Sequence, residues 1–76
     1  MDKSNSFTVQ SILFDNNLYT TKQARQWLNK HNYKPIKRVH QTEKYLRYRI
    51  QIPQHNGKYI FKQINDGIKL ILMKKS

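Results

Sequence analysis

The side chains best suited to chemistry in this sequence are cations. The densest basic stretch contains Lys34, Lys37, Arg38, Lys44, Arg47 and Arg49, and Glu43 is its only acid. Cations on an exposed sheet face neutralise phosphates, and an exposed ring such as that of Tyr45 can stack on an unpaired base. The stretch therefore predicts a phosphate-binding surface. An ordinary solvated sheet face would show the same pattern at Arg47 and Arg49, so that alternative stays open.

A second basic group is expected on a helix. Lys22, Arg25 and Lys30 fall on the side opposite Trp27, which lies at the centre of the apolar stripe of that helix. A basic helix surface can contact the backbone or a groove of nucleic acid. Solvation of an exposed helix explains the same three residues, and both interpretations remain at this point.

Patterns typical of catalysis or metal binding are missing from the sequence. The three histidines, His31, His40 and His55, share no metal-ligand spacing, and no cysteine can assist them. The four acids do not cluster as the carboxylates of a metal-dependent nuclease do. With two glycines, the chain has no glycine-rich phosphate loop. We therefore expect no enzyme activity, no cofactor, no bound metal and no small-molecule substrate, and we expect His31 to pack on the apolar helix face.

Net charge narrows the possible partners. The 76 residues include 15 Lys and Arg against four Asp and Glu, which gives a formal net charge of +11. A charge of this size destabilises a compact state by self-repulsion unless an anionic partner relieves it. The candidates are nucleic acid, an anionic membrane surface and an acidic protein. A membrane partner is disfavoured because the chain has no apolar run of spanning length and its helix has no wide apolar face.

Length and cysteine content indicate a single domain working in a reducing compartment. A chain of 76 residues is long enough for one domain only. The absence of cysteine rules out disulfides and suits an intracellular setting. Residues 1–6 are polar and do not have the pattern of a secretory signal. We expect an intracellular protein that is not secreted.

Local patterns predict one helix near the start of the chain. Residues 1–6 are expected to form a disordered arm, and 7–14 a first strand with a bulge near Gln10 or Ser11, where the apolar parity changes. Thr20 and Gln23 have the spacing of a capping box, which predicts a helix over 21–31. Asn32 can end it in the left-handed conformation, and Pro35 prevents its continuation.

The rest of the chain is predicted to form strands. We expect strands over 33–39, 45–52, 58–64 and 68–73. The strand over 45–52 alternates clearly between apolar and polar residues. Asp66 and Gly67 predict a tight hairpin turn because this pair tolerates positive φ. The prediction is an α+β fold, β-α-β-β-β-β, with one helix packed on an antiparallel sheet of three to five strands. It forms a single basic domain over 7–74, and residues 75–76 fray.

A resemblance to a known family covers most of the chain, from Val9 to Met73. It is carried by Ile12-Leu13-Phe14, by Tyr19-Thr20 with Ala24, Trp27-Leu28 and His31-Asn32-Tyr33-Lys34, by Thr42-Glu43 with Tyr45-Leu46-Arg47-Tyr48-Arg49, and by Gly67-Ile68-Lys69-Leu70-Ile71. These residues resemble a small strand–helix–strand domain of tailed-phage head-morphogenesis proteins and of basic proteins of large DNA viruses of amoebae. The resemblance implies a strand–helix–strand fold and a viral origin. A viral protein of this kind is expected in the infected cell or in the virion, and the resemblance implies no catalytic residues.

Two functions follow as expectations. The first is sequence-nonspecific binding of nucleic acid, most readily DNA, through phosphate contacts made by both basic groups. Nothing in the sequence matches a motif that reads bases. The alternative is a structural module that docks on an acidic viral or host protein, or that assembles with its own copies as a homodimer or small homo-oligomer through an edge strand.

Overall fold

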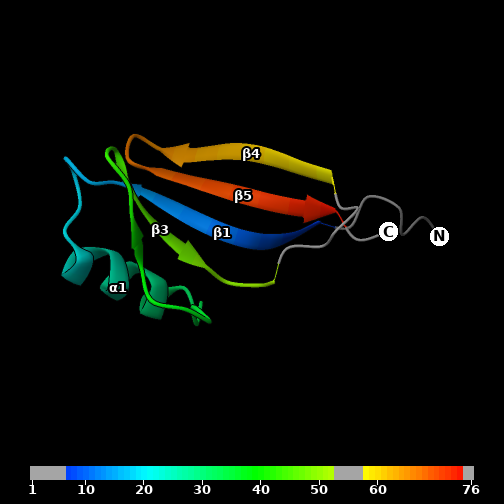
Figure 1. The fold of residues 1–76 in the computed structure, drawn as a ribbon, viewed down its shortest axis with the longest axis horizontal. Helices are drawn as coiled ribbons and strands as arrows, with labels where there is room; N and C mark the ends of the chain where they lie inside the picture. The colour runs from blue at the N-terminus through cyan, green and yellow to red at the C-terminus, as the bar shows by residue number, and fades with distance from the viewer. Residues whose placement is uncertain (1–6, 53–57, 75–76) are drawn as a thin grey trace.

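The computed structural model describes residues 7–52 and 58–74, which form one helix and five strands (Figure 1). In chain order the elements are β1 (Phe7–Asp15), α1 (Thr21–Lys30), β2 (His40–Gln41), β3 (Tyr45–Arg49), β4 (Lys58–Asn65) and β5 (Ile68–Lys74). The predicted α+β class and element order are confirmed. The expected N-terminal arm over 1–6, residues 53–57 and the expected frayed end at 75–76 lie outside the described residues.

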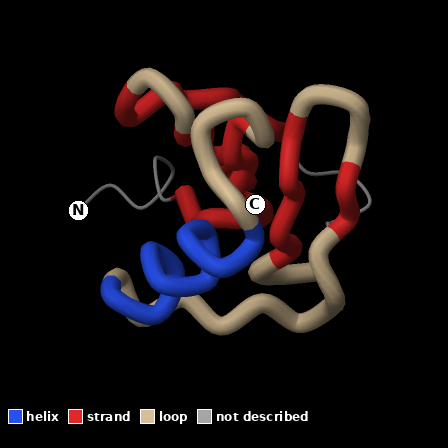
Figure 2. The backbone as a smooth tube through the Cα atoms, turned by 90° about the vertical axis from the view of Figure 1, so that its left-hand side faces the viewer, coloured by secondary structure: helices blue, strands red, loops and turns tan. Residues whose placement is uncertain are grey.

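The five strands form one antiparallel sheet with the order β2-β3-β1-β5-β4. β1 is therefore the central strand, and β2 and β4 are the two edges. Figure 2 shows α1 lying against one face of this sheet. In Figure 1 the helix lies toward the β3 side, while β4 forms the far edge. The two edges of the sheet thus have very different surroundings.

The core lies between α1 and the three middle strands. Phe14 of β1 pairs with Leu46 of β3 on one side and with Ile68 of β5 on the other, so all three point toward the helix. Ala24 and Leu28 of α1 are buried against them. Each fully buried aliphatic or aromatic side chain of this kind contributes about 1.5–3 kcal/mol. Because the core is small, stability depends strongly on each member.

The helix is fixed at both ends as the sequence predicts. The Gln23 amide donates to the Thr20 hydroxyl at 3.2 Å, and the Thr20 amide donates to the Gln23 side-chain oxygen at 2.9 Å, which completes the capping box. The helix ends at Lys30, and Asn32 takes the left-handed conformation with φ 63°. These caps satisfy backbone groups that a ten-residue helix otherwise leaves unpaired.

The apolar face of α1 is less deeply buried than the sequence indicates. Trp27 is half-buried and packs edge-to-face on Phe14, with ring centres 5.6 Å apart. His31 stacks on Trp27 at 3.9 Å, yet its side chain is exposed. Its Nδ1 lies 2.9 Å from the Trp27 carbonyl oxygen. The histidine therefore packs on the helix end, at the rim of the core.

The predicted bulge in β1 is confirmed, since the register with β5 shifts between Val9 and Ser11. The extra residue brings Gln10 inward, where its side-chain amide donates to the Gln51 carbonyl at 2.9 Å. Its oxygen accepts a hydrogen bond from the Ser11 hydroxyl at 2.8 Å. These contacts satisfy two buried polar side chains and explain why the parity of the apolar residues changes at this point.

The predicted hairpin turn between β4 and β5 is present, but its glycine is not there to allow positive φ. Gly67 does not have positive φ, and Asn32 is the only non-glycine residue with positive φ in the described ranges. A Cβ atom on Gly67 would lie 2.6 Å from Cε2 of Tyr19, whose ring packs edge-to-face on Phe14. Glycine is therefore required by the close approach of the Tyr19 ring.

The prediction of a strand over 33–39 is wrong, and the strand predicted over 45–52 ends at Arg49. After the helix the chain continues as an irregular segment, because Asn32 reverses its direction and Pro35 has no amide hydrogen for a strand ladder. Pairing with β3 begins only at His40, after the end of the predicted strand. Ile52, the last residue of the predicted strand, is 74% exposed.

Candidate nucleic-acid interface

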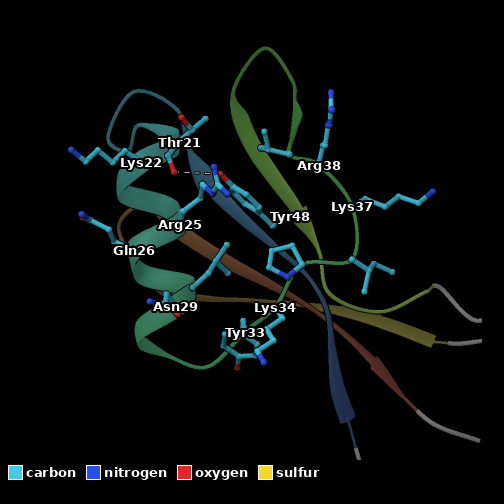
Figure 3. A pocket seen from close by; sticks show the side chains of 14 residues that line it. Thr21, Lys22, Arg25, Gln26, Asn29, Tyr33, Lys34, Lys37, Arg38 and Tyr48 are labelled. Carbon is cyan, nitrogen blue, oxygen red and sulfur yellow. Dashed lines mark hydrogen bonds between the residues drawn. The ribbon is translucent and has the colours of Figure 1, made fainter.

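A groove of about 1180 Å³ separates α1 from the irregular segment that follows it (Figure 3). We call it the basic groove. Its walls come from the helix, from the segment 33–39 and from β3. It is lined by Thr21, Lys22, Arg25, Gln26, Leu28, Asn29, Tyr33, Lys34, Pro35, Ile36, Lys37, Arg38, Val39 and Tyr48. Members of the two basic groups that were predicted separately from the sequence thus line one groove.

The charged residues that line the basic groove are all positive. Two of its cations come from α1, Lys22 and Arg25, and three come from the opposite wall, Lys34, Lys37 and Arg38. All five side chains are exposed. Within the described residues, no acidic side chain is among those that line the groove. An anion in the groove would therefore meet cations from both walls without repulsion from a nearby carboxylate.

A smaller hollow of about 160 Å³ continues the same surface, and we call it the arginine hollow. It is lined by Lys37, Arg38, His40, Arg47 and Arg49. Lys37 and Arg38 line both features, so they connect the basic groove to the hollow. Arg47 and Arg49 alternate with the buried Leu46 and Tyr48 along β3, which places them on the side of the sheet away from α1. The cationic surface thus extends around this part of the sheet.

Arg47 has an unsatisfied donor in this region. Its Nε is buried and has no hydrogen-bond partner among the described residues. A buried donor without a partner loses the hydrogen bonds it would make in water, which costs about 1–3 kcal/mol. An oxygen of a bound anion is a suitable acceptor for a guanidinium. The side chains that line the arginine hollow therefore supply the positive charge that an anion site needs.

Backbone hydrogen bonds hold the outer wall of the groove in place. The Tyr33 amide donates to the Leu28 carbonyl of α1 at 2.9 Å, and the Ile36 amide donates to the Arg49 carbonyl of β3 at 2.9 Å. These two bonds tie the irregular segment to the helix at one end and to the sheet in its middle. The cations that follow, Lys37 and Arg38, are thereby presented at a fixed part of the surface.

Tyr48 of β3 lines the basic groove and connects the sheet to α1. Its hydroxyl donates to the Thr21 carbonyl at 3.5 Å, as the dashed line in Figure 3 marks. Burial raises the pKa of Tyr48 above its ordinary value of 10.0, and the positive charge of Arg25 offsets part of that rise. The hydroxyl is therefore protonated at neutral pH and serves as a donor, with the Arg25 guanidinium nearby.

Three residues predicted for the interface line neither feature: Lys30, Lys44 and Tyr45. Tyr45 contacts Lys69 instead, whose ammonium group donates to the phenolic oxygen at 3.0 Å and lies 5.3 Å from the ring centre. The structure brings together the other seven predicted cations, Lys22, Arg25, Lys34, Lys37, Arg38, Arg47 and Arg49.

Several polar lining residues were not predicted. Gln26 and Asn29 line the basic groove, and His40 lines the arginine hollow. Helical spacing could have found the first two, because Gln26 follows Lys22 by four positions and Asn29 follows Arg25 by four. The amide side chains of Gln26 and Asn29 can add hydrogen bonds to a bound phosphate without changing the charge of the groove.

The structure offers no cluster of metal ligands in the part of the chain that it describes. No group of three or more His, Asp or Glu side chains within residues 7–52 and 58–74 is arranged to hold a metal ion. In those same residues, no helix is long and apolar enough to cross a membrane.

No protein-family model, curated protein or solved structure matches the chain. The resemblance to viral strand–helix–strand domains therefore remains a prediction.

Proposed function

We propose that this protein binds the phosphate backbone of nucleic acid, with DNA as its main ligand, and that it does so without regard to sequence. The observation that carries the proposal is the basic groove, where five cations face one another across two walls with no lining acid. The arginine hollow extends the same surface by two further arginines. Such a surface fits a polyanion better than a single small anion, because its charges are spread over several elements.

Electrostatics supports this assignment. Lys22 and Arg25 on one wall face Lys34, Lys37 and Arg38 on the other, and like charges held near one another raise the free energy of the folded protein. At physiological salt the Debye length is about 8 Å, so neighbouring cations are only partly screened. Binding a phosphate chain replaces that repulsion with attraction and releases condensed counterions from the nucleic acid. The gain in free energy comes from charge, which every sequence supplies equally.

The chemistry of the lining residues favours contacts to the backbone over base reading. Phosphate contacts fix the position of a protein on nucleic acid but carry no sequence information. The protein acts by binding and performs no catalysis. Together with the viral resemblance, this points to a protein that covers or organises a viral genome inside the infected cell, in the cytoplasm or nucleus, or within the virion.

The proposal predicts a steep dependence of affinity on salt. If about six of the seven cations contact phosphates, the logarithm of the association constant should fall with the logarithm of salt concentration at a slope of about −5. Fluorescence anisotropy of a labelled DNA duplex, titrated with the protein at several salt concentrations, measures this slope. A second duplex of unrelated sequence should give the same affinity.

A slope near zero, or no binding at low salt by the folded protein, would contradict the proposal. Polyglutamate that competes as well as DNA would instead favour the alternative of an acidic protein partner, because the surface would then recognise charge without the phosphate chain.

A further inference from the structure

Strand β4 is an edge strand whose side chains are exposed along its entire length. Four of its eight residues are large and apolar, and they point to both faces of the sheet: Tyr59, Ile60, Phe61 and Ile64. Phe61 is the most exposed, at 69%. A long, apolar edge strand of this kind is a template for pairing with another strand.

The opposite edge of the sheet is unsuited to such pairing. β2 has only two residues, and it adjoins the arginine hollow, to which His40 belongs. On β4, by contrast, Lys58 and Lys62 are the only charged residues. Cationic side chains therefore gather near one edge of the sheet, and exposed apolar side chains gather at the other. The two edges have the composition of two separate binding surfaces.

We propose that β4 pairs antiparallel with β4 of a second copy of this chain, so that the protein forms a two-fold symmetric dimer. This inference does not rest on the proposed function, because no residue of β4 lines either cationic feature. The pairing would add backbone hydrogen bonds between the two edge strands and cover the exposed apolar side chains.

The charge pattern of β4 selects one register for this dimer. In a symmetric antiparallel pair, one residue lies opposite itself, and residues at equal distances on either side of it face one another. Two registers leave a single residue of β4 unpaired, and they are centred on Phe61 and on Lys62. Centring on Lys62 places two ammonium groups directly opposite each other, which is destabilising.

The register centred on Phe61 has no such conflict. It places Lys62 opposite Ile60, so that the aliphatic stem of the lysine packs on an isoleucine. Tyr59 then faces Gln63. Phe61 is paired with Ile71 in β5, whose side chain points away from α1, so the two Phe61 rings meet on the face of the sheet without a helix. The strand is therefore self-complementary in one register.

The proposed dimer joins the two sheets edge to edge and leaves both basic grooves at its outer ends. Since each copy carries a formal charge of +11, salt should strengthen the dimer by screening the repulsion between copies. Binding of DNA responds to salt in the opposite direction. The two proposals can therefore fail separately, and the experiments can tell which has failed.

The chain has no cysteine, so single-cysteine variants report the register directly. Opposite residues in an antiparallel pair have Cα atoms about 4.5–5.5 Å apart, which is within the range of a disulfide. Under mild oxidation, the Phe61→Cys variant should convert to a covalent dimer, doubling its mass on a non-reducing gel. The matched Gln63→Cys variant, on the same face of the same strand, should stay monomeric, because its two cysteines would be about 13 Å apart along the strand.

Two further measurements complete the test. A mixture of Tyr59→Cys and Gln63→Cys chains should form a mixed disulfide, since these positions face one another. Sedimentation equilibrium of the unmodified protein should show twice the 9.3 kDa mass of the chain at high concentration, and the dimer fraction should rise with salt. A 9.3 kDa species at every concentration and salt, or faster crosslinking of Lys62→Cys than of Phe61→Cys, would overturn the proposal.

Discussion

Replacing Lys37 and Arg38 together by glutamate should lower the affinity for DNA at least about a hundredfold, the largest loss expected from any pair of charge reversals. These two residues line both the basic groove and the arginine hollow. Their reversal removes two phosphate contacts and puts two negative charges where the two features join. The salt slope should also become shallower by about 2, roughly one for each lost contact. Anisotropy titrations of one labelled duplex with both proteins measure the two effects.

The double variant Lys30→Glu with Lys44→Glu provides a charge-matched control. It changes the net charge by the same amount, and both of its positions line neither feature. If affinity depends on the placement of the cations, this control should bind DNA much more tightly than the Lys37 and Arg38 variant. Equal losses in the two variants would show that net charge alone governs binding.

Phe14→Ala should destabilise the fold by about 3–5 kcal/mol, which is enough to unfold much of a domain of this size. Phe14 is fully buried, and its ring makes edge-to-face contacts with Tyr19, Trp27 and Tyr48 at centre distances of 5.4–5.7 Å. Truncation therefore removes one member from three aromatic pairs and leaves a cavity between the helix and the sheet. Urea unfolding followed by circular dichroism measures the loss.

The matched control is Phe61→Ala, which deletes the same atoms from an exposed position on β4. In dilute solution, where the proposed dimer is dissociated, it should change the free energy of unfolding by less than about 1 kcal/mol. If the two variants were equally stable, the core would not be organised around Phe14.

Much of the fold could be predicted because its signals are local. Thr20 and Gln23 mark the start of α1 through hydrogen bonds within one turn, and the parity change after Val9 marks the bulge. The irregular segment after the helix could not be predicted in the same way. Its residues 33–39 include Val and Ile, which are common in strands. The path of the chain is nevertheless set by the reversal at Asn32 and by the backbone hydrogen bond from the Ile36 amide to the Arg49 carbonyl.

Gly67 shows the same limit at a single residue. The sequence places a turn there correctly, but the constraint on Gly67 is the ring of Tyr19, far away in the chain. The cationic site is a similar case. Its cations are visible in the sequence as two separate groups, while their meeting across one groove depends on how the helix and the following segment pack. Contacts between distant residues have no signature in a local pattern.

DNA is expected to lie in the basic groove, and amide chemical-shift mapping of the ¹⁵N-labelled protein titrated with a short DNA duplex tests this location directly. The largest shifts should come from Lys22 and Arg25, from the segment 34–40, and from Arg47 and Arg49. Amides of β4 should change little on addition of DNA. Shifts concentrated on β4 and β5, with the groove amides unchanged, would contradict the claim.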